Sequence, residues 1–184
     1  MRTTRDLSLV ILFSIISLFY GAAVTPLTMI LGVIPGAVHL FGIGHSIIIS
    51  LALLTYEGRR WRFFLQGLLV TFLFLPTTAG GFTFDIFSRI PIVFGSFLAD
   101  LIFNSIYGLF QRRKKLSLWV ALASVSFFFL DLVFRYPIWS LLYSSAVMAA
   151  FVYGLLFMMP VIIIEWTFGG LIGHKIHKRI KNIG

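Results

Sequence analysis

Two acid–base pairs with the same spacing are the residues of this sequence best suited to binding chemistry. Asp85 precedes Arg89 by four residues, and Asp131 precedes Arg135 by four residues. Residues four apart share one face of a helix, so each pair can be a self-contained ion pair of little consequence. Alternatively, the two carboxylates and two guanidiniums, with an aromatic neighbour such as Phe82, ring one opening. They would then hold a small, polar, partly planar molecule by forked hydrogen bonds and by stacking.

A polar stripe follows Arg89 along the next hydrophobic segment. Ser96, Asp100 and Asn104 step by four residues and therefore lie on one helical face. Asp100 comes eleven residues after Arg89, which places it about 16 Å deeper, near the middle of a membrane. An ionisable group at that depth requires a partner or a proton. The stripe predicts either one wall of a polar cavity or a hydrogen-bonded clasp between helices.

Two histidines near the start of the second hydrophobic segment are spaced for ligand contact rather than for metal binding. His39 and His45 are six residues apart and point to different helical faces, whereas a metal-binding pair would be four apart. We expect one of them to contact a ligand and the other to pack in the bundle or at its interface. The sequence therefore predicts no metal site and no cofactor. Glu165 is expected to pair with a basic loop, with proton coupling as the alternative.

The elements that position these groups must lie in a membrane, because the composition leaves no other solvent. Of 184 residues, 59% are apolar and 11% are charged, against roughly 25% charged in soluble proteins. The mean hydropathy is +1.01. These values exclude an ordinary soluble domain and an intrinsically disordered chain. Cys is absent, which excludes disulfides, thiolate nucleophiles and cysteine-ligated metals.

Six hydrophobic segments are candidates to cross a bilayer, which takes about 20 apolar residues. The sequence therefore predicts an all-α fold, in which residues 1–184 form a single polytopic membrane domain built as a bundle of six transmembrane helices. The predicted spans are about 7–24, 37–56, 63–75, 90–110, 116–134 and 142–172.

The net charge of +9 supports this layout rather than nucleic-acid binding. If both termini are cytoplasmic, 13 of the 15 Lys and Arg residues fall on the inner side, and the exceptions are Arg89 and Arg135. This asymmetry follows the positive-inside rule, so we expect a multi-pass plasma-membrane protein with both ends in the cytoplasm. We expect the first segment to be retained, because its apolar run is long and Asp6 interrupts the basic region of a signal peptide.

Two further features concern the first segment and the connection that follows it. Ser17 and Gly21 form a small-xxx-small pair that allows close approach of another helix, within the bundle or on a second membrane subunit. Residues 25–36 are apolar but contain two Pro and two Gly residues. They are expected to form either an interfacial loop or a lid that folds back over the bundle.

The layout and two motifs resemble the substrate-binding S-component of energy-coupling factor (ECF) transporters. The first motif is Arg2-Thr3-Thr4-Arg5-Asp6-Leu7, at the entry to the first span. The second is Gly81-Phe82-Thr83-Phe84-Asp85-Ile86-Phe87-Ser88-Arg89-Ile90-Pro91, which leads to Gly95-Ser96-Phe97-Leu98-Ala99-Asp100. The likeness extends over nearly the whole chain and is one of layout and loose motif.

The resemblance implies capture of a vitamin or related micronutrient in an outward-facing pocket, with the first outer loop as a lid. It also implies a transmembrane coupling subunit and two cytoplasmic ATPases as partners. The chain departs from the family in two places. Ser17 and Gly21 replace the alanine-xxx-alanine pattern of the first span, and Arg2 replaces the His of a metal-binding Met-His start, which disfavours nickel or cobalt transport.

Two other functions are open from the sequence. One is a membrane-embedded enzyme, a hydrolase or lipid-modifying transferase, although Ser96 lacks the surrounding pattern of a nucleophile. The other is an independent channel or secondary transporter, although no inverted repeat is visible. The sequence holds no nucleotide-binding loop or metalloprotease motif. We therefore expect a protein that is not an enzyme and that binds a small molecule and membrane lipid, but no nucleic acid.

Overall fold

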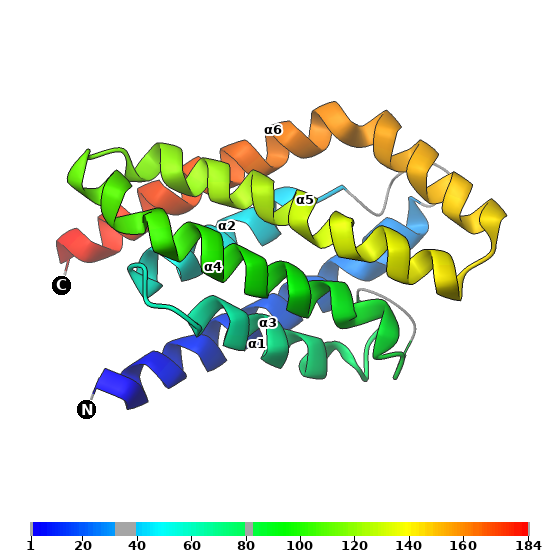
Figure 1. Cartoon of the computed structure of the whole chain (residues 1–184), viewed down its shortest axis with the longest axis horizontal. Coiled ribbons are helices and arrows are strands. Elements are labelled where there is room, and N and C mark those ends of the chain that lie inside the picture. The colour runs from blue at the N-terminus through cyan, green and yellow to red at the C-terminus, as the bar shows by residue number, and fades with distance from the viewer. Residues whose placement is uncertain (1, 32–39, 80–82, 184) are drawn as a thin grey trace.

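The computed structural model describes residues 2–31, 40–79 and 83–183, and within these residues the chain is all-helical. Six α-helices and one short 3-10 helix follow one another in this described part (Figure 1). Their bounds are α1 Arg2–Ile30, α2 Gly42–Tyr56, α3 Arg62–Phe74, η2 Phe87–Arg89, α4 Ile90–Arg112, α5 Leu116–Leu142 and α6 Ser145–Ile183.

Four of these helices are long and apolar enough to cross a membrane, namely α1, α4, α5 and α6. The protein is therefore a membrane protein. Helices α2 and α3 are equally apolar but have 15 and 13 residues, which gives them lengths of about 22 and 20 Å. Both are shorter than a hydrocarbon core of roughly 30 Å. Each of the six predicted hydrophobic segments thus contains a helix in its described part, but two of these helices are too short for a full crossing on their own.

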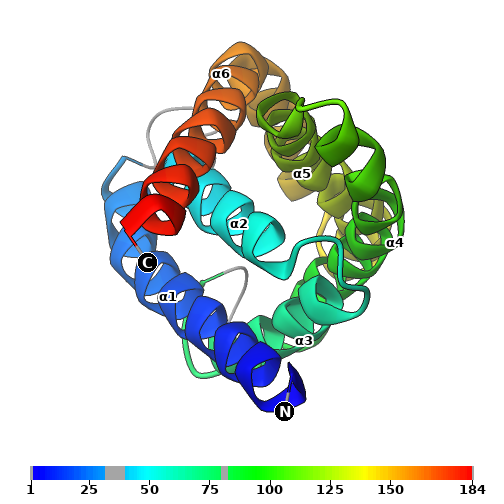
Figure 2. The ribbon, with the colours of Figure 1, turned by 90° about the vertical axis from the view of Figure 1, so that its left-hand side faces the viewer.

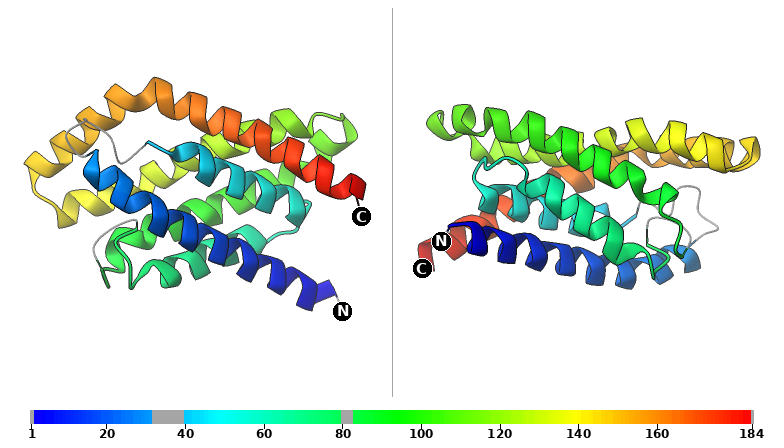
Figure 3. Two further views of the ribbon diagram at one scale, coloured as in Figure 1. Left: turned by 180° about the vertical axis from the view of Figure 1, so that it is seen from behind. Right: turned by 60° about the horizontal axis from the view of Figure 1, so that its bottom comes forward.

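Helix α2 lies at the centre of the bundle, and the other five α-helices form a ring around it (Figure 2). Both termini lie at the same end of the molecule in every view (Figures 1 and 3). We call this the termini end, and it also contains the connections 57–61 and 113–115. The opposite end, called the distal end, contains residues 75–79 and 83–86 between α3 and α4 and the connection 143–144.

The hydrophobic core surrounds the second half of α2, on the side of the termini end. Leu53 and Tyr56 of α2 belong there to the same buried cluster as Trp119 of α5, and all three are almost fully buried. Small residues bring α6 close to α2, because a Cβ atom on Gly169 would lie 2.7 Å from the carbonyl oxygen of Ile43. In hydrocarbon, such close backbone packing replaces the hydrophobic effect as the main source of helix association.

Three helices continue beyond the ends predicted from the sequence. Helix α1 passes through Pro26 to Ile30, so residues 25–30 are helical rather than part of a loop, and α5 passes through Pro137 to Leu142. Helix α6 ends at Ile183 instead of near residue 172. A proline removes one backbone hydrogen bond, but inside a bilayer no water competes for the remaining ones, so the helix persists. Residues 32–36 of the predicted lid or interfacial loop lie outside the described residues.

Candidate ligand-binding site

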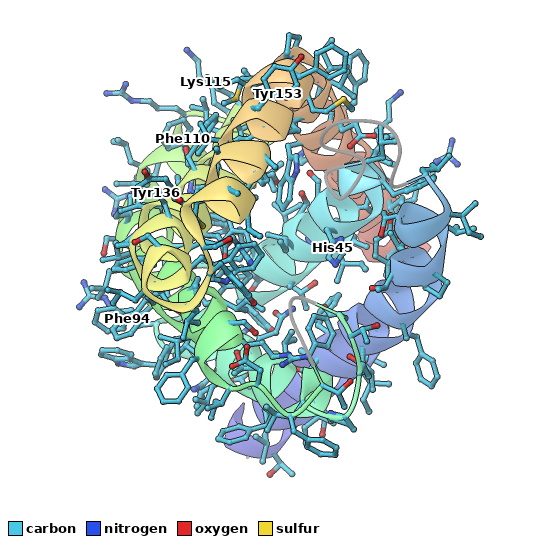
Figure 4. The ribbon with its side chains drawn as sticks, turned by 90° about the vertical axis from the view of Figure 1, so that its right-hand side faces the viewer. His45, Phe94, Phe110, Lys115, Tyr136 and Tyr153 are labelled. Carbon is cyan, nitrogen blue, oxygen red and sulfur yellow. The ribbon has the colours of Figure 1, made fainter. Side chains whose placement is uncertain are left out.

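A cavity of about 510 Å³ lies in the distal half of the bundle. It exists because α2 does not fill this half of the ring. The first residue of α2, Gly42, donates its backbone N–H over 2.8 Å to Oε2 of Glu165, which lies near the midpoint of α6. Figure 4 looks into the bundle from the distal end and shows His45 on α2 within the ring of surrounding helices. The volume lies within the range of roughly 300–1,000 Å³ that is typical of small-molecule sites.

The walls of the cavity are mostly apolar and include seven aromatic side chains. The aromatic residues that line it are Phe63, Phe74, Phe127, Phe128, Trp139, Phe151 and Trp166. They come from α3, α5 and α6, so flat faces and edges approach the space from several directions. Such walls favour a ligand with a planar ring, because rings stack or pack edge to face on one another.

The charged part of the lining is the pair Asp131 and Arg135 on α5. The Nε atom of Arg135 donates to Oδ2 of Asp131 over 2.7 Å, and the two side chains are 14% and 12% exposed. The other carboxylate oxygen, Oδ1 of Asp131, is buried and has no hydrogen-bond partner among the described residues. The guanidinium carbon of Arg135 lies 4.8 Å from the ring centroid of Trp139. An orphaned buried carboxylate oxygen costs free energy unless a ligand or water supplies a donor.

Three of the uncharged polar residues in the lining belong to α2, α3 and α4. His45 of α2, Gln66 of α3 and Ser96 of α4 all line the cavity. The hydroxyl of Tyr56 donates to Oε1 of Gln66 over 2.9 Å. This bond fixes the orientation of the Gln66 amide, so its NH₂ group can donate to another partner. The His45 ring packs edge-on against Tyr20, with 4.7 Å between centroids. The site therefore offers donors and acceptors from four helices.

The other predicted acid–base pair, Asp85 and Arg89, does not line the cavity. Arg89 is fully buried and donates to the backbone carbonyl oxygens of Thr77, Ala79 and Asp85 at 2.6, 3.2 and 2.6 Å. The Asp85 carboxylate accepts the backbone N–H groups of Phe87 and Ser88, at the start of η2. These residues order the α3–α4 connection, of which Thr78 and Ala79 form part of the cavity wall. The expectation that both pairs ring one opening is thus wrong, and Arg89 acts on the wall rather than in the cavity.

Asp100 and Asn104 also lie outside the cavity lining. The Asp100 carboxylate accepts the backbone N–H groups of Trp61, Phe63 and Phe64 at 2.8, 2.8 and 3.1 Å. Asn104 donates from Nδ2 to the carbonyl oxygen of Arg59 over 3.2 Å. The structure therefore agrees with the clasp alternative for these two residues and not with a cavity wall. Only Ser96 of the polar stripe faces the cavity, because the stripe runs along α4 from the distal half towards the termini end.

Two residues proposed for contact with another subunit face the inside of the bundle instead. Ser17 is 7% exposed, and both Ser17 and Gly21 line the cavity. A Cβ atom on Gly21 would lie 2.9 Å from the ring of Phe74, so this glycine serves packing of α1 on α3. The expected pairing of Glu165 with a basic loop is also corrected, because its carboxylate binds the start of α2.

Two predicted site residues, His39 and Phe82, lie outside the described residues.

Several residues that were not predicted from the sequence line the site or hold it together. Gln66 could have been noticed as a rare polar side chain in an apolar segment, and Gly169 and Gly173 form a small-xxx-small pattern in the printed sequence. The salt bridges of Asp6 with Arg59 and Arg62 join distant segments, and no local pattern signals them. Among the described residues, no group of three or more His, Asp or Glu side chains is arranged for a metal ion.

Comparison with known proteins identifies no relative of this chain. No protein-family model matches the chain, and neither a curated protein nor a solved structure matches it. Function is therefore inferred from the cavity, from the charge distribution and from the resemblance in layout.

Proposed function

We propose that the protein is the substrate-capture subunit of a membrane importer for a vitamin or related small micronutrient. The observation that carries the proposal is the aromatic cavity of about 510 Å³ with the Asp131–Arg135 pair in its wall. A cavity that is mostly apolar, with a few polar groups fixed on rigid helices, is typical of a small-molecule binding site. In this proposal a separate transmembrane coupling subunit and cytoplasmic ATPases supply the energy, as the resemblance to ECF S-components implies.

The proposal includes six membrane crossings in the plasma membrane, with both termini in the cytoplasm. Helices α2 and α3 would each cross with the help of the connections at their ends. The termini end carries 13 of the 15 Lys and Arg residues, which the positive-inside rule assigns to the cytoplasm. The cavity lies mainly in the other half of the bundle, so it would receive its ligand from outside the cell.

Native mass spectrometry of the purified protein tests the proposal. We expect a small molecule to be released from the protein besides lipid. Asp131→Asn and Arg135→Gln should each lower its occupancy at least tenfold, because each removes one half of the pair in the cavity wall. Asp85→Asn is the matched control, since Asp85 lies outside the lining and Asn caps a helix as well as Asp does.

Three results would contradict the proposal. Release of lipid alone would leave no captured substrate. If the small molecule had the same occupancy in the Asp131 and Asp85 variants, it would bind outside the cavity lined by Asp131. Conversion of the bound compound into a product by the isolated chain would favour the alternative of a membrane-embedded enzyme, a hydrolase or lipid-modifying transferase.

A further inference from the structure

The Asp131–Arg135 pair presents a hydrogen-bond acceptor beside hydrogen-bond donors. The bond from Nε of Arg135 to Oδ2 of Asp131 holds the two planar groups together at 2.7 Å. It leaves Oδ1 of Asp131, a buried atom, as an acceptor without a partner among the residues described. A ligand in the cavity that Asp131 lines reaches this oxygen when the carboxylate turns towards it. It also leaves the two terminal guanidinium nitrogens of Arg135 as donors, since the printed bond uses Nε. The complement of this arrangement is a ligand edge with an N–H group next to a carbonyl oxygen.

The charge of the lining favours an uncharged ligand. Asp131 and Arg135 neutralise each other within the cavity wall, and no other Asp, Glu, Lys or Arg lines the cavity in the described part of the chain. An ion that enters such a space loses its hydration and finds no net opposite charge to replace it. A neutral molecule with polar atoms along one edge meets no such penalty.

The aromatic walls favour a flat ring over an aliphatic molecule. Trp139 lies beneath the Arg135 guanidinium, while Phe127, Phe128 and Trp166 form an aromatic group on the same cavity. A ring whose polar edge reaches the ion pair would therefore have aromatic faces beside it. Stacking on aromatic side chains contributes binding free energy beyond that of buried apolar area, and it favours planar ligands.

We propose that the ligand of this cavity is an uncharged planar heterocycle with a lactam edge, a ring N–H beside a ring carbonyl, held by Asp131 and Arg135. Asp131 Oδ1 accepts the ring N–H, and the terminal nitrogens of Arg135 donate to the ring carbonyl. Gln66 and Ser96, on the facing helices α3 and α4, are placed to bind further polar atoms of the ligand. The inference rests on the proposed function, because it names the chemical class of the captured substrate.

Four probes of similar size and shape separate the ligand classes. Quinazolin-4(3H)-one carries the lactam edge, and its 3-methyl derivative lacks the N–H. The 1-methylquinolinium ion is a planar cation, and 2-naphthoate is a planar anion. Binding to the purified chain in lipid nanodiscs is followed by quenching of tryptophan fluorescence, since Trp139 and Trp166 line the cavity, and by the shift of the unfolding temperature.

We expect quinazolin-4(3H)-one to bind at least tenfold more tightly than its 3-methyl derivative and than either ion. Asp131→Asn should reduce the preference over the methyl derivative below threefold. The Asn oxygen would turn to Nε of Arg135, which places an NH₂ donor where Oδ1 stood and opposes the ring N–H. If this variant does not fold, the comparison of the two matched probes on the unaltered chain still decides the question.

Equal binding of the matched probes, tighter binding of either ion, or no binding of the lactam would overturn the inference. Native mass spectrometry then distinguishes its failure from failure of the proposed function. A released small molecule of another class leaves the capture function in place and contradicts only the lactam assignment. Release of lipid alone contradicts both.

Discussion

At the scale of single residues, two of the six acidic side chains hold backbone groups of other segments in place. Asp100 of α4 binds the start of α3, and Glu165 of α6 binds the start of α2. The first N–H groups of a helix have no partner within it, and inside a membrane no water replaces one. A carboxylate from a neighbouring helix satisfies them and interacts favourably with the positive end of the helix dipole. Asp131 differs, because it lines the cavity and keeps one oxygen without a partner among the described residues.

The three hydrogen bonds of Asp100 predict a large effect of its removal. Asp100→Ala leaves the backbone N–H groups of Trp61, Phe63 and Phe64 without their acceptor. The free energy of unfolding in detergent should fall by roughly 2–4 kcal/mol, the combined loss of a cap and of buried hydrogen bonds. Asp100→Asn keeps one acceptor oxygen and should cost about half as much.

Asp85→Ala is the control for this experiment. The Asp85 carboxylate caps only the short helix η2, so its loss should cost about 1 kcal/mol or less. Equal losses for Asp85→Ala and Asp100→Ala would show that the start of α3 does not depend on Asp100.

At the scale of the elements, the central position of α2 depends on small residues of α6. Gly169 and Gly173 face Ser46 and Ser50 of α2, and Cβ atoms on these glycines would lie 2.5 and 2.6 Å from the serine Cβ atoms. The Ser46 hydroxyl then donates to the carbonyl oxygen of Trp166 over 2.6 Å. Close contact and hydrogen bonding together replace the hydrophobic effect that is missing between helices in lipid.

Gly169→Ala tests this packing. The new methyl group would lie 2.7 Å from the Ile43 carbonyl oxygen, a backbone atom that cannot move aside on its own. We predict a loss of about 1–3 kcal/mol in the free energy of unfolding, as for other overpacked sites. Gly108→Ala is the matched control in another helix, because nothing lies within 4 Å of its added Cβ, and it should be neutral or stabilising by up to about 1 kcal/mol. Similar effects of the two substitutions would contradict a packing role of Gly169.

The sequence predicts the elements well and their partners poorly. Hydropathy locates all six helical segments, since each must keep apolar side chains in lipid. It cannot distinguish the pair Asp85–Arg89 from the pair Asp131–Arg135, because the spacing is the same and only the tertiary structure places one pair in the cavity wall. Asp6 illustrates the same limit, since its partners Arg59 and Arg62 are more than fifty residues away.

At the scale of the whole molecule, charge and cavity lie at opposite ends. The termini end holds the four basic clusters, in residues 2–5, 59–62, 112–115 and 175–181. The cavity lies mainly in the distal half, beside the first turns of α2. If the basic end is cytoplasmic, the cavity lies mainly in the outer half of the molecule.

Cysteine labelling of intact cells tests this orientation, and the chain suits the method because it contains no Cys. Single substitutions at exposed positions report each side: Thr83→Cys and Ser144→Cys at the distal end, and Arg60→Cys and Arg113→Cys at the termini end. A membrane-impermeant maleimide should label the first two in intact cells and the last two only after permeabilisation. Labelling of Arg113→Cys in intact cells would show that the protein has the opposite orientation in the membrane. The cavity would then face the cytoplasm. Labelling of Arg60→Cys alone from outside would make α2 and α3 a re-entrant hairpin, which agrees with their lengths of 15 and 13 residues but leaves four crossings instead of six.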